Sequence, residues 1–213
     1  MSKIYFMEMS TENQADNWRF EKKYPVALSN MQNFFKVLHD SAFYPAYPSR
    51  IINNCYYDNT KWDSFYDNVN GLSKRSKVRF RWYDKDLVNG HMEIKIKHED
   101  VNRKEYPNFN LLSSVNTWKE LLGEEQKHCY PTLINQYKRE YFQDFKGNRL
   151  TIDSHLKFAQ PTTLIETKPN FINYNEFNII EIKYNTNTNL SDFKIPTPLL
   201  KFSKYVTGIK HVY

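Results

Sequence analysis

Alternating apolar and polar side chains predict a protein built mainly of β-strands. The pattern is clearest in SKVRFRWY, residues 76–83. Because successive side chains of a strand point to opposite faces, its three cations share one face, namely Lys77, Arg79 and Arg81. The opposite face carries three large apolar side chains, namely Val78, Phe80 and Trp82. A row of positive charge therefore runs along one surface of this predicted strand.

Five other segments repeat this period of two with ionic or polar side chains on one face. These faces are Arg19, Glu21 and Lys23; Glu93, Lys95 and Lys97; Tyr137, Arg139 and Tyr141; Arg149, Thr151 and Asp153; and Glu181 and Lys183. Apolar and aromatic content predicts further strands at residues 51–58 and 162–167. The first strand is expected to end at Pro25, since proline cannot donate to a strand ladder.

Apolar positions at helical spacing predict three helices. The first ends near Asp40, and its apolar side is Leu28, Met31, Phe34, Phe35 and Leu38. The second, within residues 113–125, has Ser114 as N-cap, Gly123 as its end, and an apolar stripe of Trp118, Leu121 and Leu122. The third begins with Thr197 as N-cap and Pro198 in the first turn, and its buried side is Leu199, Phe202, Tyr205, Val206 and Ile209.

The order of these elements indicates the class of fold. Seven or eight strands dominate, they mostly follow one another along the chain, and three helices accompany them. This composition favours an antiparallel α+β fold, for which a closed barrel is one solution. No linker-like tract divides the 213 residues, so one domain is expected.

Composition adds two expectations. The net charge of +6 and a pI of about 9.1 favour anionic partners. Cys55 and Cys129 lack the spacing of a metal or redox site, so both are expected to be free structural residues. The N-terminus lacks the apolar core of a signal peptide, and no stretch approaches the roughly 18 apolar residues of a membrane span. These features predict a soluble cytoplasmic protein.

The charged faces permit two interpretations. An antiparallel sheet that buries one face and exposes the other shows the same alternation, which explains any single strand. Six strands with mostly basic faces fit better with cations that converge on one enclosed space. Two like charges about 4 Å apart repel by roughly 4 kcal/mol at an effective dielectric constant of 20, so such a space must hold water or anions. Arginine is suited to bind phosphate there, and the interspersed glutamates to bind Mg²⁺ or Mn²⁺.

Seven segments, in the same order, resemble the VTC domain. They are RFEKKYPV, the stretch from NCYYDNTKW to RFRWY, MEIKIK, YKREYF, RLTID, EIKY and KFSKYVTGI. The VTC domain is the polyphosphate polymerase domain of the vacuolar transporter chaperone complex and of bacterial proteins. It belongs to the CYTH, or triphosphate tunnel metalloenzyme, superfamily. The resemblance implies a tunnel-shaped antiparallel barrel of about eight strands with flanking helices and a C-terminal helix. The expected organisation is an N-terminal extension, 1–18, followed by a stand-alone VTC domain of the bacterial type, 19–213.

The same resemblance implies roles for individual residues. Phosphate-binding residues would be Lys23, Arg79, Arg81, Lys95, Tyr137, Arg139, Arg149, Ser203 and Lys204. The metal ligands would be Glu181 and Glu21, holding Mn²⁺ or Mg²⁺. The catalytic set would be Arg79, Arg81, Lys23 and Glu181. One departure is notable: the superfamily signature of the first strand is Glu-x-Glu-x-Lys, and Arg19 occupies its first position. This departure favours the VTC branch over hydrolytic relatives.

The implied activity is transfer of the γ-phosphate of ATP to a growing polyphosphate chain. Three alternatives stay open: a metal-dependent triphosphatase that acts on inorganic triphosphate or nucleoside triphosphates, a polyphosphate-binding module without catalysis, and a nucleic-acid-binding protein. Nucleic acid is not expected as a partner, because the tyrosines and phenylalanines mostly alternate into outer or core faces. A membrane or protein partner of unknown identity is left open.

Overall fold

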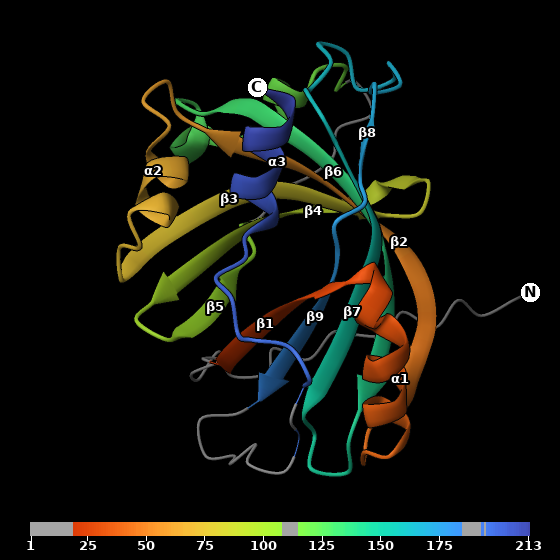
Figure 1. The fold of residues 1–213 in the computed structure, drawn as a ribbon. Helices are drawn as coiled ribbons and strands as arrows, with labels where there is room; N and C mark the ends of the chain where they lie inside the picture. The colour runs from red at the N-terminus through yellow and green to blue at the C-terminus, as the bar shows by residue number, and fades with distance from the viewer. Residues whose placement is uncertain (1–18, 108–114, 185–192, 194) are drawn as a thin grey trace, which may run out of the picture.

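A computed structural model describes residues 19–107, 115–184, 193 and 195–213. Within these residues, nine strands form a single antiparallel sheet (Figure 1). The strands are β1 (Arg19–Ala27), β2 (Tyr44–Asp58), β3 (Lys74–Tyr83), β4 (Asp86–His98), β5 (Val101–Glu105), β6 (Tyr130–Gln143), β7 (Arg149–Ala159), β8 (Ile172–Tyr174) and β9 (Phe177–Tyr184). The α+β class is confirmed.

The sheet closes on itself as a barrel. Its order is β6-β2-β3-β4-β5-β1-β9-β7-β8, and pairing of β6 with β7 joins the two sides. Eight strands form the wall, while β8 pairs only with β7 and lies outside the closed ring. The closed antiparallel barrel of about eight strands is therefore confirmed.

The barrel has two distinguishable ends. Helices α2 (Asp63–Val69) and α3 (Lys204–Val212) lie at one end, where β2 finishes and β3 begins (Figure 1). We call this the α3 end. At the opposite end β3 finishes at Tyr83 and β4 begins, and β6 also finishes there. The strand directions alternate around the ring, so residues near these termini share one rim.

Apolar side chains lie mostly on the outside of the wall, beneath other segments. Helix α1 (Met31–His39) covers the outer face of β1, β7 and β9, where Phe34 and Leu38 pack on residues such as Ile180. The segment that contains Trp118 covers the outer face of β2, β3 and β4. A third cluster fills the α3 end inside the barrel, where Tyr205 packs among inward residues of β2, β6 and β7. This arrangement leaves the charged faces to the interior.

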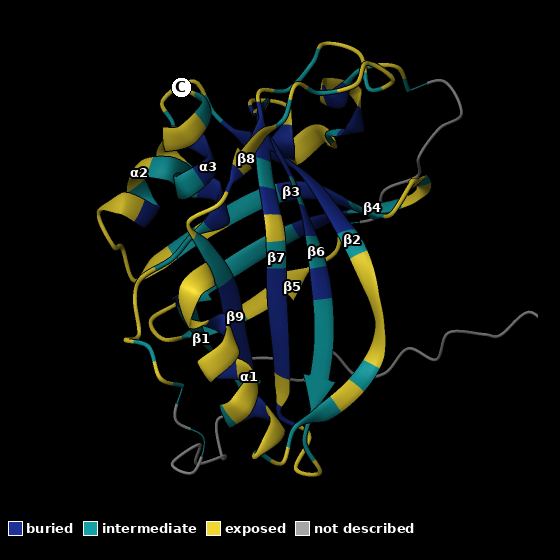
Figure 2. Cartoon of the chain, turned by 45° about the vertical axis from the view of Figure 1, so that its right-hand side comes forward, coloured by how far each residue is buried: buried dark blue, intermediate teal, exposed yellow. Residues whose placement is uncertain are grey.

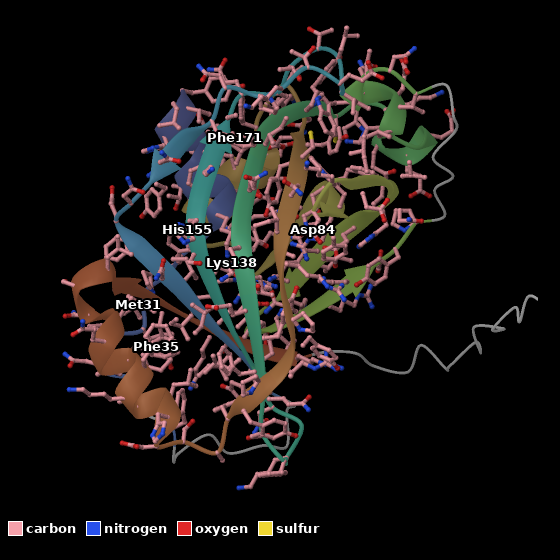
Figure 3. All side chains as sticks on the ribbon, turned by 90° about the vertical axis from the view of Figure 1, so that its right-hand side faces the viewer. Met31, Phe35, Asp84, Lys138, His155 and Phe171 are labelled. Carbon is pink, nitrogen blue, oxygen red and sulfur yellow. The ribbon has the colours of Figure 1, made fainter. Side chains whose placement is uncertain are left out.

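The exposed outer positions follow the same alternation. Figure 3 shows Lys138 on the outer side of β6 and His155 on the outer side of β7. Figure 2 shows long buried stretches in β7 and β9, whereas the first half of β2 is largely exposed. Helices in the described part of the chain are too short or too polar to cross a bilayer.

Several strand boundaries differ from the sequence-based predictions. Strand β1 continues through Pro25 to Ala27, because this part of the strand is paired with β9 alone, so one side of Pro25 needs no donor. Strand β2 begins at Tyr44 rather than near residue 51, and its early part pairs with β6 across irregularities. The strand predicted at 162–167 is wrong, since this region has only an isolated bridge at Leu164. Strands β5 and β8 were not predicted.

The helices also differ in detail. The predicted central helix is wrong: Trp118–Leu121 and Glu124–Gln126 form 3₁₀ turns, and Ser114 lies outside the described residues. The first of these turns is capped by Thr117 and Glu120. Helix α2 was missed. Residues 28–30 form a 3₁₀ turn before α1, and Leu28 and Phe35 are exposed rather than buried.

The C-terminal helix begins later than predicted. Its N-cap is Ser203, whose hydroxyl accepts a hydrogen bond from Val206 N, so Thr197 and Pro198 precede the helix. Leu199 is consequently exposed, and residues 199–203 form an irregular segment that leads to the α3 end. Cys55 and Cys129 are both free and buried, which confirms that prediction.

Candidate functional site

A cavity of about 1140 Å³ occupies the barrel lumen. All eight strands of the wall line it, together with the segment that leads into α3. Among the described residues, seventeen lysines and arginines line this cavity, but only three aspartates and glutamates do. The whole chain has 30 basic and 24 acidic residues, so its positive excess is concentrated inside the barrel.

Every site residue implied by the resemblance lines this one cavity. These residues are Glu21, Lys23, Arg79, Arg81, Lys95, Tyr137, Arg139, Arg149, Ser203, Lys204 and Glu181. They come from six strands and from α3 with its N-cap. Arg149 is exposed at the start of β7, whereas Arg81 and Lys204 are buried. The structure therefore brings them together, and their roles remain proposals.

A buried carboxylate that does not itself line the cavity contacts two arginines of β3, Arg79 and Arg81. Glu93 of β4 is 1% exposed and accepts two hydrogen bonds from Arg79, one of them from Nε at 2.8 Å. Its other oxygen lies 3.6 Å from Arg81 Nη1 and 3.0 Å from Lys104 Nζ. His91 Nε2 is 3.1 Å from the same carboxylate. Glu93 thus fixes both guanidinium groups against the wall.

A second buried carboxylate joins β6 to the closing helix. Asp153 accepts hydrogen bonds from Arg139 Nε at 2.6 Å and Arg139 Nη2 at 2.7 Å. It also accepts one from Lys204 Nζ at 2.5 Å. Burial acts to raise the pKa of Asp153, but Arg139 and Lys204 outweigh it and hold the pKa below its ordinary value. The ionised carboxylate ties the start of α3 to the wall of the lumen.

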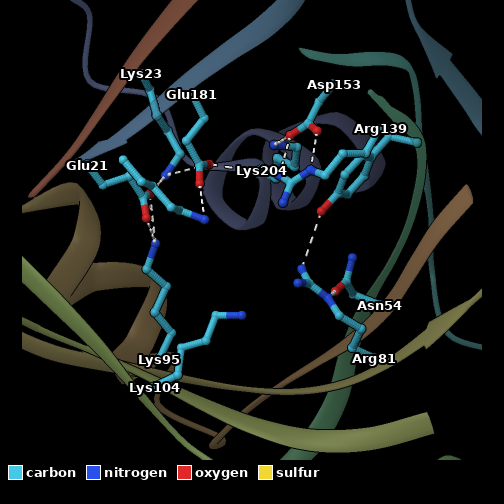
Figure 4. A network of polar contacts seen from close by, with 12 residues as sticks. Glu21, Lys23, Asn54, Arg81, Lys95, Lys104, Arg139, Asp153, Glu181 and Lys204 are labelled. Carbon is cyan, nitrogen blue, oxygen red and sulfur yellow. Dashed lines mark hydrogen bonds and ion pairs between the residues drawn. The ribbon is translucent and has the colours of Figure 1, made fainter. Parts of the chain in front are cut away.

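Lysines and glutamates alternate on the opposite wall, as Figure 4 shows. Lys95 Nζ donates to both oxygens of Glu21 at 2.8 Å, and Lys23 also donates to Glu21. Lys23 Nζ lies 3.6 Å from Glu181, which also pairs with Lys183 at 2.6 Å. Two carboxylates are therefore shared among three lysines, which come from β1, β4 and β9.

The protonation of this wall follows from burial and charge. Burial and Glu181 act to raise the pKa of Glu21, but Lys23, Lys95 and Lys183 outweigh them, so the pKa falls below its ordinary value. Burial lowers the pKa of Lys95 from 10.5 to about 7, although Glu21 opposes this shift. Burial, assisted by Arg79, lowers the pKa of Lys104 by a similar amount, to about 7. Burial, together with the surrounding cations, thus disfavours the charged forms of these two lysines.

Lys77 shows this crowding most clearly. Its Nζ donates to Ser203 Oγ at 2.8 Å and lies 5.8 Å from the centre of the Tyr205 ring. With its amide oxygen turned toward the cations, Asn68 accepts from Lys77 at 3.0 Å. Burial, followed by repulsion from Lys95 and other cations, lowers the pKa of Lys77 well below its ordinary value. A bound anion would relieve this repulsion.

The two glutamates provide a limited set of metal ligands. Glu21 and Glu181 lie on paired strands, where Glu21 faces Lys183 and Glu181 faces Lys23. No cluster of three or more acidic, histidine or cysteine side chains suited to a metal occurs in the described residues. Mg²⁺ is commonly held by one or two carboxylates together with phosphate oxygens, so this pair fits a cation that arrives with its phosphate ligand. Neither Cys55 nor Cys129 lines the cavity.

Some residues of the site were not predicted as such. Lys77, Lys104, Lys183 and Lys201 line the cavity, and Glu93 and Asp153 hold its cations from behind. Lys77, Lys183, Glu93 and Asp153 follow the same period of two as the predicted residues, so that signal was available. Lys104 could not be found in this way, because the short strand β5 was not recognised.

This chain matches one family model and is similar to several solved structures. The family model of the VTC domain matches residues 18–213. The structure of the PH1819 protein from Pyrococcus horikoshii OT3 is similar over 91% of this chain and 99% of its own, with 11% identity and a TM-score of 0.52. HpAC1 from Hippeastrum, a protein with a dominant triphosphatase activity, is similar over 92% of this chain and 97% of its own, with 14% identity and a TM-score of 0.49. The comparison with curated proteins gave no match.

Proposed function

Because this chain belongs to the VTC domain family, we propose that it transfers the γ-phosphate of ATP to the end of an inorganic polyphosphate chain held in the barrel lumen. The observation that carries the proposal is the excess of basic over acidic side chains that line the cavity. Seventeen lysines and arginines, but only three aspartates and glutamates, line one cavity of about 1140 Å³ among the described residues. Like charges at such density repel by several kcal/mol per close pair, and a linear polyanion is the ligand that removes this cost.

The arginines are suited to phosphate oxygens. Arg79, Arg81 and Arg139 come from two strands, and each is oriented by a hydrogen bond from its Nε to a carboxylate or an amide oxygen. Their remaining N–H groups can donate to successive phosphates. In the transfer step, an oxygen of the terminal phosphate of the chain attacks the γ-phosphorus. The bond between this phosphorus and the β-γ bridging oxygen breaks, and ADP leaves with the electron pair.

The protein would contribute positioning and charge to this step. A loose phosphoryl-transfer transition state places negative charge on the peripheral oxygens, where fixed guanidinium and ammonium groups stabilise it. Mn²⁺ or Mg²⁺ would be held by Glu181 and Glu21 and would neutralise phosphate charge. The lysines beside these carboxylates would keep both ionised.

Product analysis tests the activity directly. The protein is incubated with ATP and Mn²⁺. Polyphosphate is then resolved by gel electrophoresis, and released orthophosphate is measured separately. Accumulation of long polyphosphate and ADP supports the proposal. Accumulation of orthophosphate alone would show that water takes the place of the acceptor, as in a triphosphatase. Binding of tripolyphosphate without any turnover would identify a binding module.

Replacing Glu181 by glutamine tests the metal role. Glu181→Gln keeps the size of the side chain but removes its charge, so metal-dependent turnover should fall at least about 100-fold. Tripolyphosphate binding measured without metal should persist, because the cations are unchanged. Glu124→Gln is the matched control, since Glu124 is 83% exposed on the surface. Full activity of Glu181→Gln would exclude this role.

A further inference from the structure

Three lumen-facing rows end in tyrosine at the same rim of the barrel. On β3 the inward row is Arg79, Arg81 and Tyr83, and on β6 it is Tyr137, Arg139 and Tyr141. Tyr106 follows Lys104 at the end of β5. Each of these strands finishes at the end of the barrel opposite α3, so along these three rows the basic residues lie deeper in the lumen and the phenol rings lie nearer its rim.

The tyrosines lie along an arc of the rim. A fourth, Tyr47 of β2, lies opposite Tyr141 in the sheet register, with ring centres 6.1 Å apart. Tyr83 lies 6.1 Å from the ring of His91, which lies 5.7 Å from Tyr106. The arc therefore spans five neighbouring strands, from β6 through β2, β3 and β4 to β5. We call Tyr47, Tyr83, Tyr106 and Tyr141 the tyrosine collar.

The collar differs from the other tyrosines of the lumen. Tyr56 and Tyr205 are almost fully buried, and their hydroxyls bond to Arg79 and Asp58 as part of the folded core. Tyr47 and Tyr106 are instead 59% and 58% exposed, although both line the cavity. Exposed ring faces beside a phosphate-binding cavity are available to a ligand.

The charge of the collar is compatible with an incoming anion. Burial raises the pKa values of Tyr106 and Tyr141, so both phenols stay neutral at physiological pH. Arg50 of β2 lies over the Tyr83 ring, 5.5 Å from its centre, and adds a positive charge beside the aromatic faces. The rim thus combines ring faces with a cation, next to the row that begins with Arg81.

A ligand that matches this order carries an aromatic ring at one end and phosphates at the other. Resting on the proposed function, we infer that the nucleoside of the phosphate donor stacks on the tyrosine collar, so that the triphosphate enters the lumen from this rim. Neighbouring positions in an inward row are about 7 Å apart, which leaves room for the sugar between Tyr83 and the arginines. Inorganic triphosphate and polyphosphate have no ring and gain nothing from the collar.

This placement also gives the reaction a direction. The γ-phosphate points into the lumen toward Arg79 and Arg139, and the acceptor chain lies on the α3 side, near Lys77 and Ser203. Stacking depends on the π-face that every base presents, so the collar supports purine nucleotides with little discrimination between adenine and guanine. We therefore expect ATP and GTP to bind with affinities within several-fold of each other.

Calorimetric titration with ATP and with inorganic tripolyphosphate, both without divalent metal, tests the inference. Tyr106→Ala and Tyr83→Ala are compared with Tyr106→Phe and Tyr83→Phe, which keep the ring. The alanine variants should lose about fivefold to 100-fold in affinity for ATP and stay within twofold of the original chain for tripolyphosphate. The phenylalanine variants should keep both affinities. Tyr66→Ala is a further control, because Tyr66 is an exposed tyrosine on α2 outside the cavity.

The outcomes separate the collar from the proposed activity. An equal loss for both ligands, or no loss for either, would overturn the collar. Tyr106 is more than half exposed, so its alanine variant is expected to fold even if Tyr83→Ala does not. Polyphosphate synthesis from ATP with unchanged ligand preference in the alanine variants would reject the collar and keep the activity. Selective loss of ATP binding in a protein that makes no polyphosphate would keep the collar as a nucleotide site and reject the activity.

Discussion

At the scale of single residues, two carboxylates behind the lumen determine where its cations point. Glu93 and Asp153 are almost completely buried, and neither lines the cavity. Each accepts paired hydrogen bonds from an arginine and a further contact from a lysine. Because arginine binds through a planar fork, fixing its inner N–H groups leaves the outer ones aimed at the ligand.

Glu93→Gln should therefore affect both stability and anion binding. Removing this charge leaves Arg79 and Arg81 buried without their counter-ion, which is expected to lower the free energy of unfolding by about 3 kcal/mol. Tripolyphosphate should stabilise this variant more than the original chain, since phosphate supplies the missing negative charge. Thermal unfolding with and without the anion measures both effects.

A neighbouring glutamate provides the control for this test. Glu105→Gln alters a half-exposed side chain on β5 that pairs with Arg103, and a change below about 0.5 kcal/mol is expected. If Glu93→Gln were as stable as this control, the positioning role of Glu93 would be excluded.

At the scale of elements, the close packing of α3 decides where the phosphate-binding residues of its first turn lie. A Cβ at Gly208 would lie 2.5 Å from Leu133 Cδ2 and 2.6 Å from Phe158 Cδ1. Such distances are shorter than van der Waals contact, so only glycine lets the helix approach β6 and β7 this closely. Ser203 and Lys204 reach the lumen because of this approach.

Gly208→Ala tests the docking of α3. Overpacking at this contact should lower the free energy of unfolding by about 1–3 kcal/mol and weaken tripolyphosphate binding, since Lys204 moves with the helix. Lys210→Ala, at an exposed position of the same helix, should change neither quantity appreciably. Denaturant unfolding and calorimetry provide the measurements. Unchanged stability in Gly208→Ala would show that the helix can shift without cost.

Strand β7 lines the lumen with its first half and packs against α3 with its second half. Its first half presents Arg149 and Thr151 to the lumen, whereas Leu156 and Phe158 of its second half join the cluster beneath α3. His155 adopts a φ of +53° between these halves, and the pairing with β6 shifts register nearby. This irregularity changes which residues face inward, and so divides the interior into a charged lumen and an apolar plug.

At the scale of the whole molecule, basic residues in the lumen greatly outnumber acidic ones. We therefore expect the binding of an anion to be coupled to the uptake of protons. The pKa values of Lys95 and Lys104 are lowered by burial to about 7, so above this pH both lysines are largely neutral in the free protein. Bound phosphate favours their charged forms and raises both pKa values. Binding should therefore take up protons, and the affinity for tripolyphosphate should fall from about pH 7 to about pH 9.

Calorimetry in two buffers with different heats of ionisation measures this proton uptake. Lys104→Arg keeps its charge over this pH range, so the uptake and the loss of affinity with pH should both decrease. Proton release on binding, or an affinity independent of pH, would contradict the prediction.

Much of this organisation was already determined by the sequence. The period of two placed Lys77, Arg79 and Arg81 on one face and Phe80 and Trp82 on the other, because the side-chain geometry of a strand is local. The resemblance to the VTC domain then implied a set of residues that all line the lumen. The family and the class of fold could both be inferred at this level.

The alternation of a single strand leaves open which of its faces is inside, and the tertiary structure places the charged faces there, as the set of six strands favoured. Large apolar side chains such as Phe80 point outward and are buried by segments far along the chain, while the charged faces enclose the lumen. Boundaries that depend on distant partners, such as the start of β2 and the cap of α3, could not be predicted from the sequence. Period-two alternation is the same whether the charged face meets solvent or a closed interior, because closure depends on the pairing of β6 with β7, which the local pattern does not contain.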